Sequence, residues 1–128
     1  MNPKRILVID DDEGLTGMVK LNLEATGDYE VRVENHSLQA LETAREFRPD
    51  LILLDYVMPD LDGGDVTASL QNDPFLRSIP VIMVTALVSN QETGPDGTVR
   101  AGGQVMFAKP IKLANLLRCI EKHLAAAH

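Results

Sequence analysis

The sequence predicts an α/β protein built on a five-stranded parallel sheet that is doubly wound, with a strand–helix unit repeated five times. Three observations predict this class. Short apolar runs of strand length recur along the chain. Three of them (ILVI, LILL and VIMV) lack alternation with polar residues, which is typical of strands buried on both faces of a parallel sheet. Between the runs the apolar period becomes that of a helix, which places helices on both faces of the sheet.

Each element is located by its own pattern. The strands are expected at the apolar runs, which cover residues 5–9, 29–33, 51–54, 81–84 and 104–107. Amphipathic patterns follow the first three runs at residues 15–23, 38–47 and 64–72, and the third pattern is the weakest. The last helix has the clearest pattern, because one helix face collects Leu113, Leu116, Leu117, Ile120 and Leu124.

The fourth helix is expected to be irregular. Residues 89–103 lie where this helix should form, and they include Gly94, Pro95 and Gly97. An interior glycine destabilises a helix by about 1 kcal/mol and an interior proline by about 3 kcal/mol relative to alanine. We therefore expect a fourth helix that is short, displaced or disordered.

Size and charge restrict the function. The chain has 128 residues, and we expect residues 1–128 to form a single domain. Its net charge is 12 − 19 = −7, without basic clusters, which argues against nucleic acid or an anionic membrane as a direct partner. Cys119 is the single cysteine, so no intramolecular disulfide can form. Without a recognisable signal peptide or membrane span, the expected location is the cytoplasm.

Reactive side chains occur where the predicted strands end. Asp10 and Asp11 follow the first run, Asp55 the third, Thr85 the fourth and Lys109 the fifth. Sites in doubly wound sheets lie beyond the carboxyl ends of the strands, so these side chains should converge. Carboxylates about 4 Å apart repel by roughly 4 kcal/mol at an effective dielectric constant of about 20. One lysine does not balance three carboxylates, whereas Mg²⁺ or Mn²⁺ does, because −3 + 1 + 2 = 0 and both ions prefer oxygen ligands.

Four segments carry a resemblance to a known family. ILVIDDDE, LILLDYVMPDLDG, VIMVTA and FAKP occur in this order and resemble the receiver domain of bacterial two-component response regulators over essentially the whole chain. The resemblance implies a flavodoxin-like fold and a stand-alone receiver. It also implies Mg²⁺-dependent phosphorylation of Asp55 by a histidine kinase or a histidine phosphotransfer protein. The phosphoryl group would then switch a surface for a downstream protein that the sequence does not identify.

The same resemblance implies a set of metal ligands. Asp11 and Asp55 would bind the ion through their side chains. Val57 would bind it through its backbone carbonyl, and Asp10 would act through a water molecule. Such an ion would sit beside the carboxylate that accepts the phosphoryl group.

The expected switch begins at Thr85, which would hydrogen-bond one phosphoryl oxygen while Lys109 pairs with another. Receivers place tyrosine or phenylalanine three residues before this lysine, but here that residue is Met106, and the aromatic residue is Phe107. Side chains alternate along a strand, so Phe107 is expected on the opposite face. Met106 is either the mobile group, since methionine is flexible, or a core residue in a receiver whose switch is weak or different. The resemblance also implies a cis peptide bond between Lys109 and Pro110.

Two other functions stay open. Haloacid-dehalogenase-like phosphatases also use an aspartate after the first strand, and Asp10 and Asp12 have their D-x-D spacing. The short chain, which has no cap insertion, and the presence of Asp55 oppose this reading. A degenerate receiver would bind partners without phosphorylation; the complete set of site residues argues against it, whereas Met106 does not. The receiver hypothesis expects no enzymatic turnover of a separate substrate beyond slow loss of the phosphoryl group.

Overall fold

A computed structural model of the chain describes residues 2–86, 98–101 and 104–126. Its centre is a six-stranded sheet in the order β2-β1-β3-β4-β6-β5. The strands are β1 (Lys4–Ile9), β2 (Tyr29–Glu34), β3 (Leu51–Asp55), β4 (Val81–Thr85), β5 (Thr98–Ala101) and β6 (Gln104–Ala108). The helices of the described residues are α1 (Glu13–Ala25), α2 (Ala40–Phe47), α3 (Gly63–Gln71) and α4 (Leu113–Ala126), and a short 3₁₀ helix, Ser37–Gln39, precedes α2.

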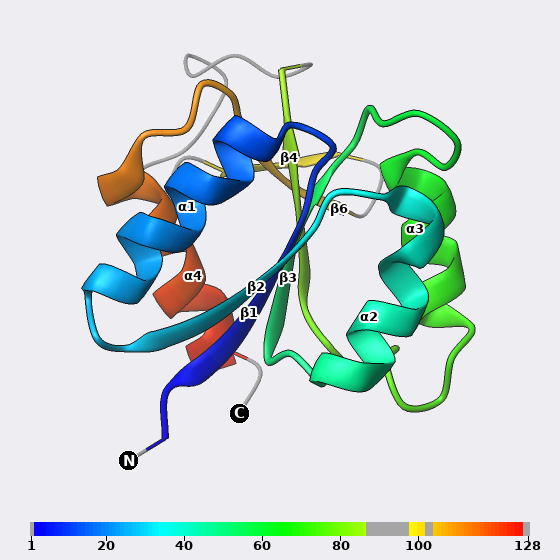
Figure 1. Ribbon diagram of the computed structural model, residues 1–128, viewed down its shortest axis with the longest axis horizontal. Coiled ribbons are helices and arrows are strands. Elements are labelled where there is room, and N and C mark those ends of the chain that lie inside the picture. The colour runs from blue at the N-terminus through cyan, green and yellow to red at the C-terminus, as the bar shows by residue number, and fades with distance from the viewer. Residues whose placement is uncertain (1, 87–97, 102–103, 127–128) are drawn as a thin grey trace.

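The sheet is covered on both faces, which confirms the flavodoxin-like arrangement. Helices α1 and α4 lie on one face, and α2 and α3 lie on the other (Figure 1). Successive side chains of β3 therefore enter different cores. Leu51 and Leu53 pack with α1 and α4, whereas Ile52 and Leu54 pack with α2 and α3. Burial of one such side chain contributes about 1.5–3 kcal/mol, which explains why these strands contain no polar alternation.

The prediction of five parallel strands was wrong at one edge of the sheet. Strands β1, β2, β3, β4 and β6 pair in parallel, but β5 is an additional edge strand that pairs with β6 in antiparallel orientation. Ala101 lies opposite Gln104 in this pair. Only two residues separate them in the sequence, and both are glycines, a pattern that favours a tight antiparallel turn.

The predicted irregularity of the fourth helix concerns residues 89–103. Residues 87–97 and 102–103 lie outside the described part of the chain. The described part of this segment, Thr98–Ala101, is strand β5 rather than helix. None of the helices found among the described residues is long and apolar enough to cross a membrane.

Two aspartates fix the helices that begin beside the carboxyl edge of the sheet. Asp12 caps α1, because its carboxylate accepts a hydrogen bond of 3.0 Å from the backbone N–H of Leu15. Asp62 caps α3 in a reciprocal arrangement with Asp65, in which each side chain accepts from the other residue's backbone N–H. Such caps satisfy amides that the first helical turn leaves without partners.

The neighbouring residues Met106 and Phe107 on β6 enter different layers. Phe107 is 2% exposed and belongs to the core beneath α1 and α4. Met106 is only partly buried and packs against the core on the side of α2 and α3. Because side chains alternate along a strand, Met106, which occupies the position expected of a switch residue, and the ring of Phe107 lie on opposite faces of the sheet.

This difference predicts the cost of truncating each residue. Phe107→Ala should lower the free energy of unfolding by about 3–5 kcal/mol, because it leaves a large cavity in a packed core. Met106→Ala should lower it by about 1 kcal/mol, because less apolar surface is lost. Urea unfolding of both variants measures the difference. Equal losses would contradict the assignment of Phe107 to the core.

Candidate functional site

Three carboxylates meet at the carboxyl edge of the sheet. Ile9 lies opposite Leu54 in the pairing of β1 with β3, so Asp10 and Asp55 leave adjacent strands at the same level. One carboxylate oxygen from each of Asp10, Asp11 and Asp55 lies within 4.8 Å of the other two. Asp10 and Asp55 are buried at 3% and 6% exposure, whereas Asp11 is exposed. The cluster therefore has a buried base and one side open to solvent.

Lys109 reaches this cluster from the loop after β6. Its Nζ donates to Asp10 Oδ2 at 3.1 Å and to Asp55 Oδ1 at 3.2 Å. The Lys109 backbone N–H donates to the carbonyl oxygen of Thr85 at 2.9 Å, which ties the ends of β4 and β6 together. The peptide bond between Lys109 and Pro110 is cis, which confirms the expectation for this bond.

The environment of these groups changes their protonation. Burial, followed by the negative charge of Asp10, raises the pKa of Asp55, and Lys109 only partly opposes this effect. Burial alone would lower the pKa of Lys109, but its hydrogen bond to Asp10 and the charges of Asp10 and Asp55 outweigh burial and raise that pKa. The lysine therefore stays charged, while the buried carboxylate pair remains short of positive charge.

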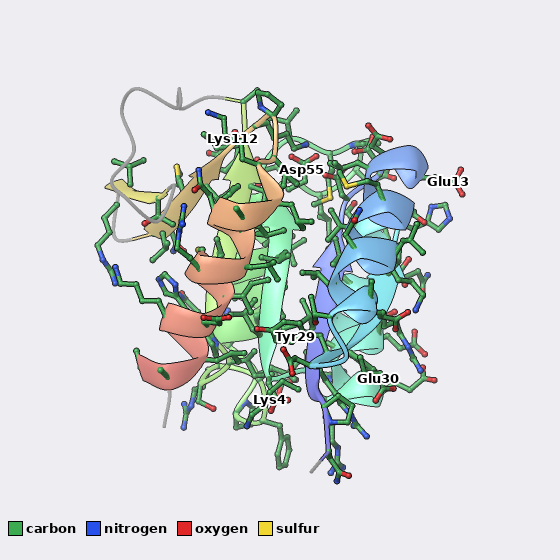
Figure 2. The ribbon with its side chains drawn as sticks, turned by 90° about the vertical axis from the view of Figure 1, so that its left-hand side faces the viewer. Lys4, Glu13, Tyr29, Glu30, Asp55 and Lys112 are labelled. Atoms are coloured by element: carbon green, nitrogen blue, oxygen red, sulfur yellow. The ribbon has the colours of Figure 1, made fainter. Side chains whose placement is uncertain are left out.

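The remaining predicted site residues occupy different places around the acids. Thr85 ends β4 and is 1% exposed. Val57 follows Asp55 by two residues, its side chain is exposed, and its backbone N–H hydrogen-bonds the Asp55 carboxylate. Met106 lies on β6 opposite Met83, and its side chain packs on the face of the sheet that α2 and α3 cover. Phe107 lies in the core on the other face of the sheet. Figure 2 shows Asp55 at one edge of the sheet, with Lys4 and Tyr29 at the opposite edge.

Sequence reasoning missed two residues that support the site. Ser37 Oγ donates to the carbonyl oxygen of Pro59 at 2.7 Å and accepts from the backbone N–H of Leu61 at 3.1 Å. These bonds hold the loop that follows Asp55. Asn35 Nδ2 donates to the carbonyl oxygen of Asp10 at 2.8 Å. No local pattern in the sequence signals either role, because both depend on loops that meet only in the fold.

Gly63 allows the chain to pack closely around Asp55. Its backbone N–H donates to the carbonyl oxygen of Tyr56 at 2.7 Å. A Cβ atom at Gly63 would lie 2.8 Å from Tyr56 Cα, 2.9 Å from the Asp55 carbonyl oxygen and 2.9 Å from Met83 Sδ. Two of these three atoms belong to the backbone, so a side chain at this position would displace the segment that carries Asp55.

The donor set fits a hard divalent cation. Asp10, Asp11 and Asp55 offer oxygen atoms only, and Lys109 leaves an uncompensated charge of −3 + 1 = −2. Oxygen ligands with an open, solvated side suit Mg²⁺, which usually keeps several water molecules. Neither sulfur nor imidazole takes part in this cluster, which makes it a poor match for zinc.

Comparison with known proteins identifies the family. The model of the response regulator receiver domain matches residues 6–121. The chain belongs to the response regulator receiver family. This receiver domain is 37% identical over 126 residues to the polar-differentiation response regulator DivK of Brucella anthropi, with 98% of this chain and 99% of the relative covered. The family assignment supports a function in two-component signalling.

Solved structures agree with this assignment. A putative response regulator from Chloroflexus aurantiacus J-10-fl has a TM-score of 0.81 and 26% identity, covering 97% of this receiver and 99% of that chain. The receiver domain of a sensor histidine kinase from Pseudomonas aeruginosa PAO1 has a TM-score of 0.78 and 27% identity, with the same coverage. The latter structure has a magnesium ion coordinated in its active-site cleft.

The close contact at Gly63 predicts a specific defect. Gly63→Ala should lower the free energy of unfolding by about 1–3 kcal/mol, because the new methyl group overlaps with backbone atoms. Gly17→Ala in α1 is the matched control, since a Cβ atom there meets nothing within 4 Å. The control should be neutral or stabilising by about 0.5–1 kcal/mol. Chemical denaturation measures both values, and a neutral Gly63→Ala variant would contradict the geometry.

The raised pKa of Asp55 predicts a pH-dependent stability. The folded chain holds the Asp55 proton more tightly than the unfolded chain does, so ionisation of this carboxyl group weakens the fold. The penalty is absent below the unfolded pKa and complete above the folded pKa. Asp55→Asn should therefore raise the unfolding temperature in metal-free buffer at pH 7 by about 4 °C, equivalent to about 1 kcal/mol in a domain of this size.

This gain should shrink as the pH falls toward the pKa of an unfolded aspartate, about 3.9. Thermal unfolding of the wild type and the variant at several pH values measures the trend. Asp28→Asn is the control, because Asp28 is exposed and lies outside the cluster. A gain that persists unchanged at acid pH, or that Asp28→Asn reproduces, would exclude relief of the buried Asp55 charge as its cause.

Proposed function

We propose that this receiver accepts a phosphoryl group on Asp55 from a histidine kinase or a histidine phosphotransfer protein in a Mg²⁺-dependent reaction, and thereby switches a protein-binding surface. The single observation that carries this proposal is the convergence of Asp10, Asp11 and Asp55 with Lys109 at one edge of the sheet. The expected location is the cytoplasm, which agrees with a sequence whose single cysteine, Cys119, is buried.

Mg²⁺ is the expected cofactor, and Mn²⁺ has the same ligand preference. Asp11 and Asp55 would hold the ion directly, Asp10 through water, and Val57 through its carbonyl group. When bound, the ion neutralises charge on the oxygens of the transferred phosphoryl group. The magnesium in the cleft of the Pseudomonas aeruginosa receiver domain supports this assignment.

The protein groups then have defined parts in the transfer. A carboxylate oxygen of Asp55 attacks phosphorus in line, a new P–O bond forms, and the P–N bond to the donor histidine breaks. The electron pair of that bond stays on the imidazole nitrogen. Lys109, already 3.2 Å from Asp55 Oδ1, compensates negative charge on the phosphoryl oxygens. Because the receiver supplies these groups itself, a small donor such as acetyl phosphate should also serve.

The switch follows from the new acceptor oxygens. Thr85 would donate its hydroxyl proton to one of them, which moves the end of β4. Met106 lies on the adjacent strand, with Met83 opposite it in the strand pairing, and is the flexible side chain able to follow that movement. Phe107 is fixed in the opposite core, so we assign it a supporting role beneath β6 rather than a mobile one.

The phosphatase alternative makes a different prediction. A haloacid-dehalogenase-like phosphatase would need Asp12 as a reactive group, but its carboxylate caps α1. We therefore propose that the receiver does not turn over a separate substrate. Phosphate-monoester hydrolysis abolished by Asp10→Asn but not by Asp55→Asn would support the phosphatase instead.

Intact mass measures phosphorylation directly. The wild type, incubated with Mg²⁺ and acetyl phosphate or a candidate kinase, should gain one phosphoryl group. Asp55→Asn should gain none, and wild type with EDTA should gain at least about tenfold less, because charge compensation on the phosphoryl oxygens is lost. A wild type that gains no group from any donor would favour the degenerate receiver. Equal labelling of Asp55→Asn would exclude Asp55 as the acceptor.

A further inference from the structure

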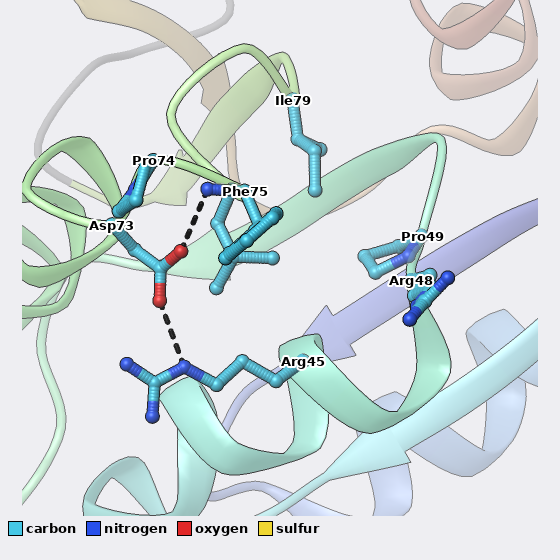
Figure 3. Close-up of a pocket in the computed structure, with 8 residues that line it drawn as sticks. Arg45, Arg48, Pro49, Asp73, Pro74, Phe75 and Ile79 are labelled. Carbon is cyan, nitrogen blue, oxygen red and sulfur yellow. Dashed lines mark hydrogen bonds and ion pairs between the residues drawn. The ribbon is translucent and has the colours of Figure 1, made fainter.

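A second candidate site lies at the opposite edge of the sheet from Asp55. A cavity of about 680 Å³ opens between the end of α2 and the segment of residues 72–80 that leads into β4. Figure 3 shows its wall, in which Arg45, Arg48 and Pro49 lie on the side of α2, and Pro74 and Phe75 lie on the other side. The residues that define it are Arg45, Arg48, Pro49, Asp73, Pro74 and Phe75. None of them takes part in the phosphoacceptor site.

An ion pair joins the two sides of the cavity. Arg45 Nε donates to Asp73 Oδ2 at 2.7 Å, and the backbone N–H of Phe75 donates to Asp73 Oδ1 at 2.8 Å (Figure 3). These bonds lower the pKa of Asp73, the hydrogen bond from Arg45 being the main cause, so this carboxyl group stays ionised. The Asp73 side chain is 3% exposed, whereas that of Arg45 is 60% exposed. The buried acid thus orients an arginine whose outer face remains available.

The ring of Phe75 is presented to solvent. It is 86% exposed, the largest value among the exposed large apolar residues of the described chain. An aromatic ring buries about 150–250 Å² when it is covered, so its exposure forgoes a substantial gain. Pro74 beside it is also exposed and extends the apolar surface, whereas Pro49 across the cavity is buried. Exposed aromatic rings next to arginines are the composition of energetic centres in protein interfaces.

Arg48 occupies a position where glycine would be easier to accommodate. It follows α2 in the left-handed conformation, with φ of 53°. That conformation is uncommon and unfavourable for a residue other than glycine. The guanidinium of Arg48 lines the cavity, and no ion pair of Arg48 is found within the described residues. Together with Arg45 and Asp73 it gives the cavity a charge of +2 − 1 = +1 in a chain of −7.

We propose that this cavity binds an extended segment of a partner protein in which a carboxylate side chain flanks a large apolar side chain. The carboxylate pairs with Arg48 and the outer face of Arg45, and the apolar side chain packs on the exposed Phe75 and Pro74. A peptide suits the site better than a small ligand does. Small-molecule sites usually enclose most of their ligand, whereas the ring of Phe75 projects outward and needs a partner that covers it from outside.

The position makes binding independent of phosphorylation. Asp55 is the last residue of β3, and Pro49 lies two residues before the first, Leu51. The two sites are therefore separated by at least the length of the strand, roughly 13 Å. A partner at this cavity leaves the phosphoacceptor edge open to a kinase. The receiver can therefore be held by one protein while another phosphorylates it.

Selection from a random peptide library tests the proposal. Phage-displayed dodecapeptides are selected on the wild-type domain and counted again on Phe75→Ser and Arg48→Ser, both exposed positions whose variants are first checked for an unchanged unfolding temperature. Enriched peptides should carry Asp or Glu beside an aromatic or large aliphatic residue. Their affinity should fall about tenfold in each variant, as expected for residues at the centre of an interface. Amide shifts in NMR spectra should map to residues 45–49 and 73–79.

Matched controls separate this site from the phosphoacceptor. Asp55→Asn should bind the same peptides with unchanged affinity, so failure of the phosphorylation experiment and failure of this one are distinguishable. Enriched peptides that map elsewhere, or that bind Phe75→Ser and Arg48→Ser as tightly as wild type, would overturn the proposal. Shifts at the same amides caused by AMP, without any enriched peptide, would also overturn it and indicate a small-molecule anion site.

Discussion

The structure depends on the meeting of like charges at the ends of two adjacent parallel strands. Asp10 and Asp55 are almost fully buried, and each lies about 3 Å from the same lysine nitrogen. Two carboxylates in such a place repel strongly, and one cation does not balance them. Burial of apolar side chains elsewhere in the domain offsets this unfavourable free energy. In β3 alone, four apolar residues lie in the two packed cores. The same deficit of positive charge makes the edge a favourable place for a divalent cation.

Precision at this edge comes from hydrogen bonds in the surrounding loops. The loop after Asp55 is held by the Ser37 hydroxyl, by the backbone bond from Gly63 to Tyr56, and by the cap that Asp62 provides to α3. Asn35 holds the backbone of Asp10 from the side of β2. These bonds restrict the positions of the carboxylates, so an incoming group meets a preorganised site instead of one that must be assembled. Met83 and Met106, which lie opposite each other on β4 and β6, have flexible side chains. Such side chains suit the proposed switch, which would move after Asp55 gains a phosphoryl group.

The two edges of the sheet have opposite chemistry. The carboxyl edge gathers acids around one lysine, whereas the cavity at the amino edge gathers two arginines around one buried acid. In both, a buried carboxylate orients a cationic side chain that is itself partly exposed. Under the two proposals, phosphoryl transfer and partner binding would use opposite edges of the sheet, and each site would use its own loops.

The parallel core, four helices and the acids at the strand ends are predictable from the sequence, because those features are local: apolar runs, helical periods, and polar residues that follow strands. The sequence also predicts that Met106 and Phe107 face opposite ways, since strand side chains alternate. Thr98–Ala101 forms an antiparallel edge strand for a reason that lies in the fold, because this pairing depends on the edge that β6 offers. The support from Ser37 and Asn35, the close packing at Gly63 and the cavity beside Phe75 arise between segments distant in sequence. No local pattern encodes them, because each depends on where the sheet register places loops that are far apart along the chain.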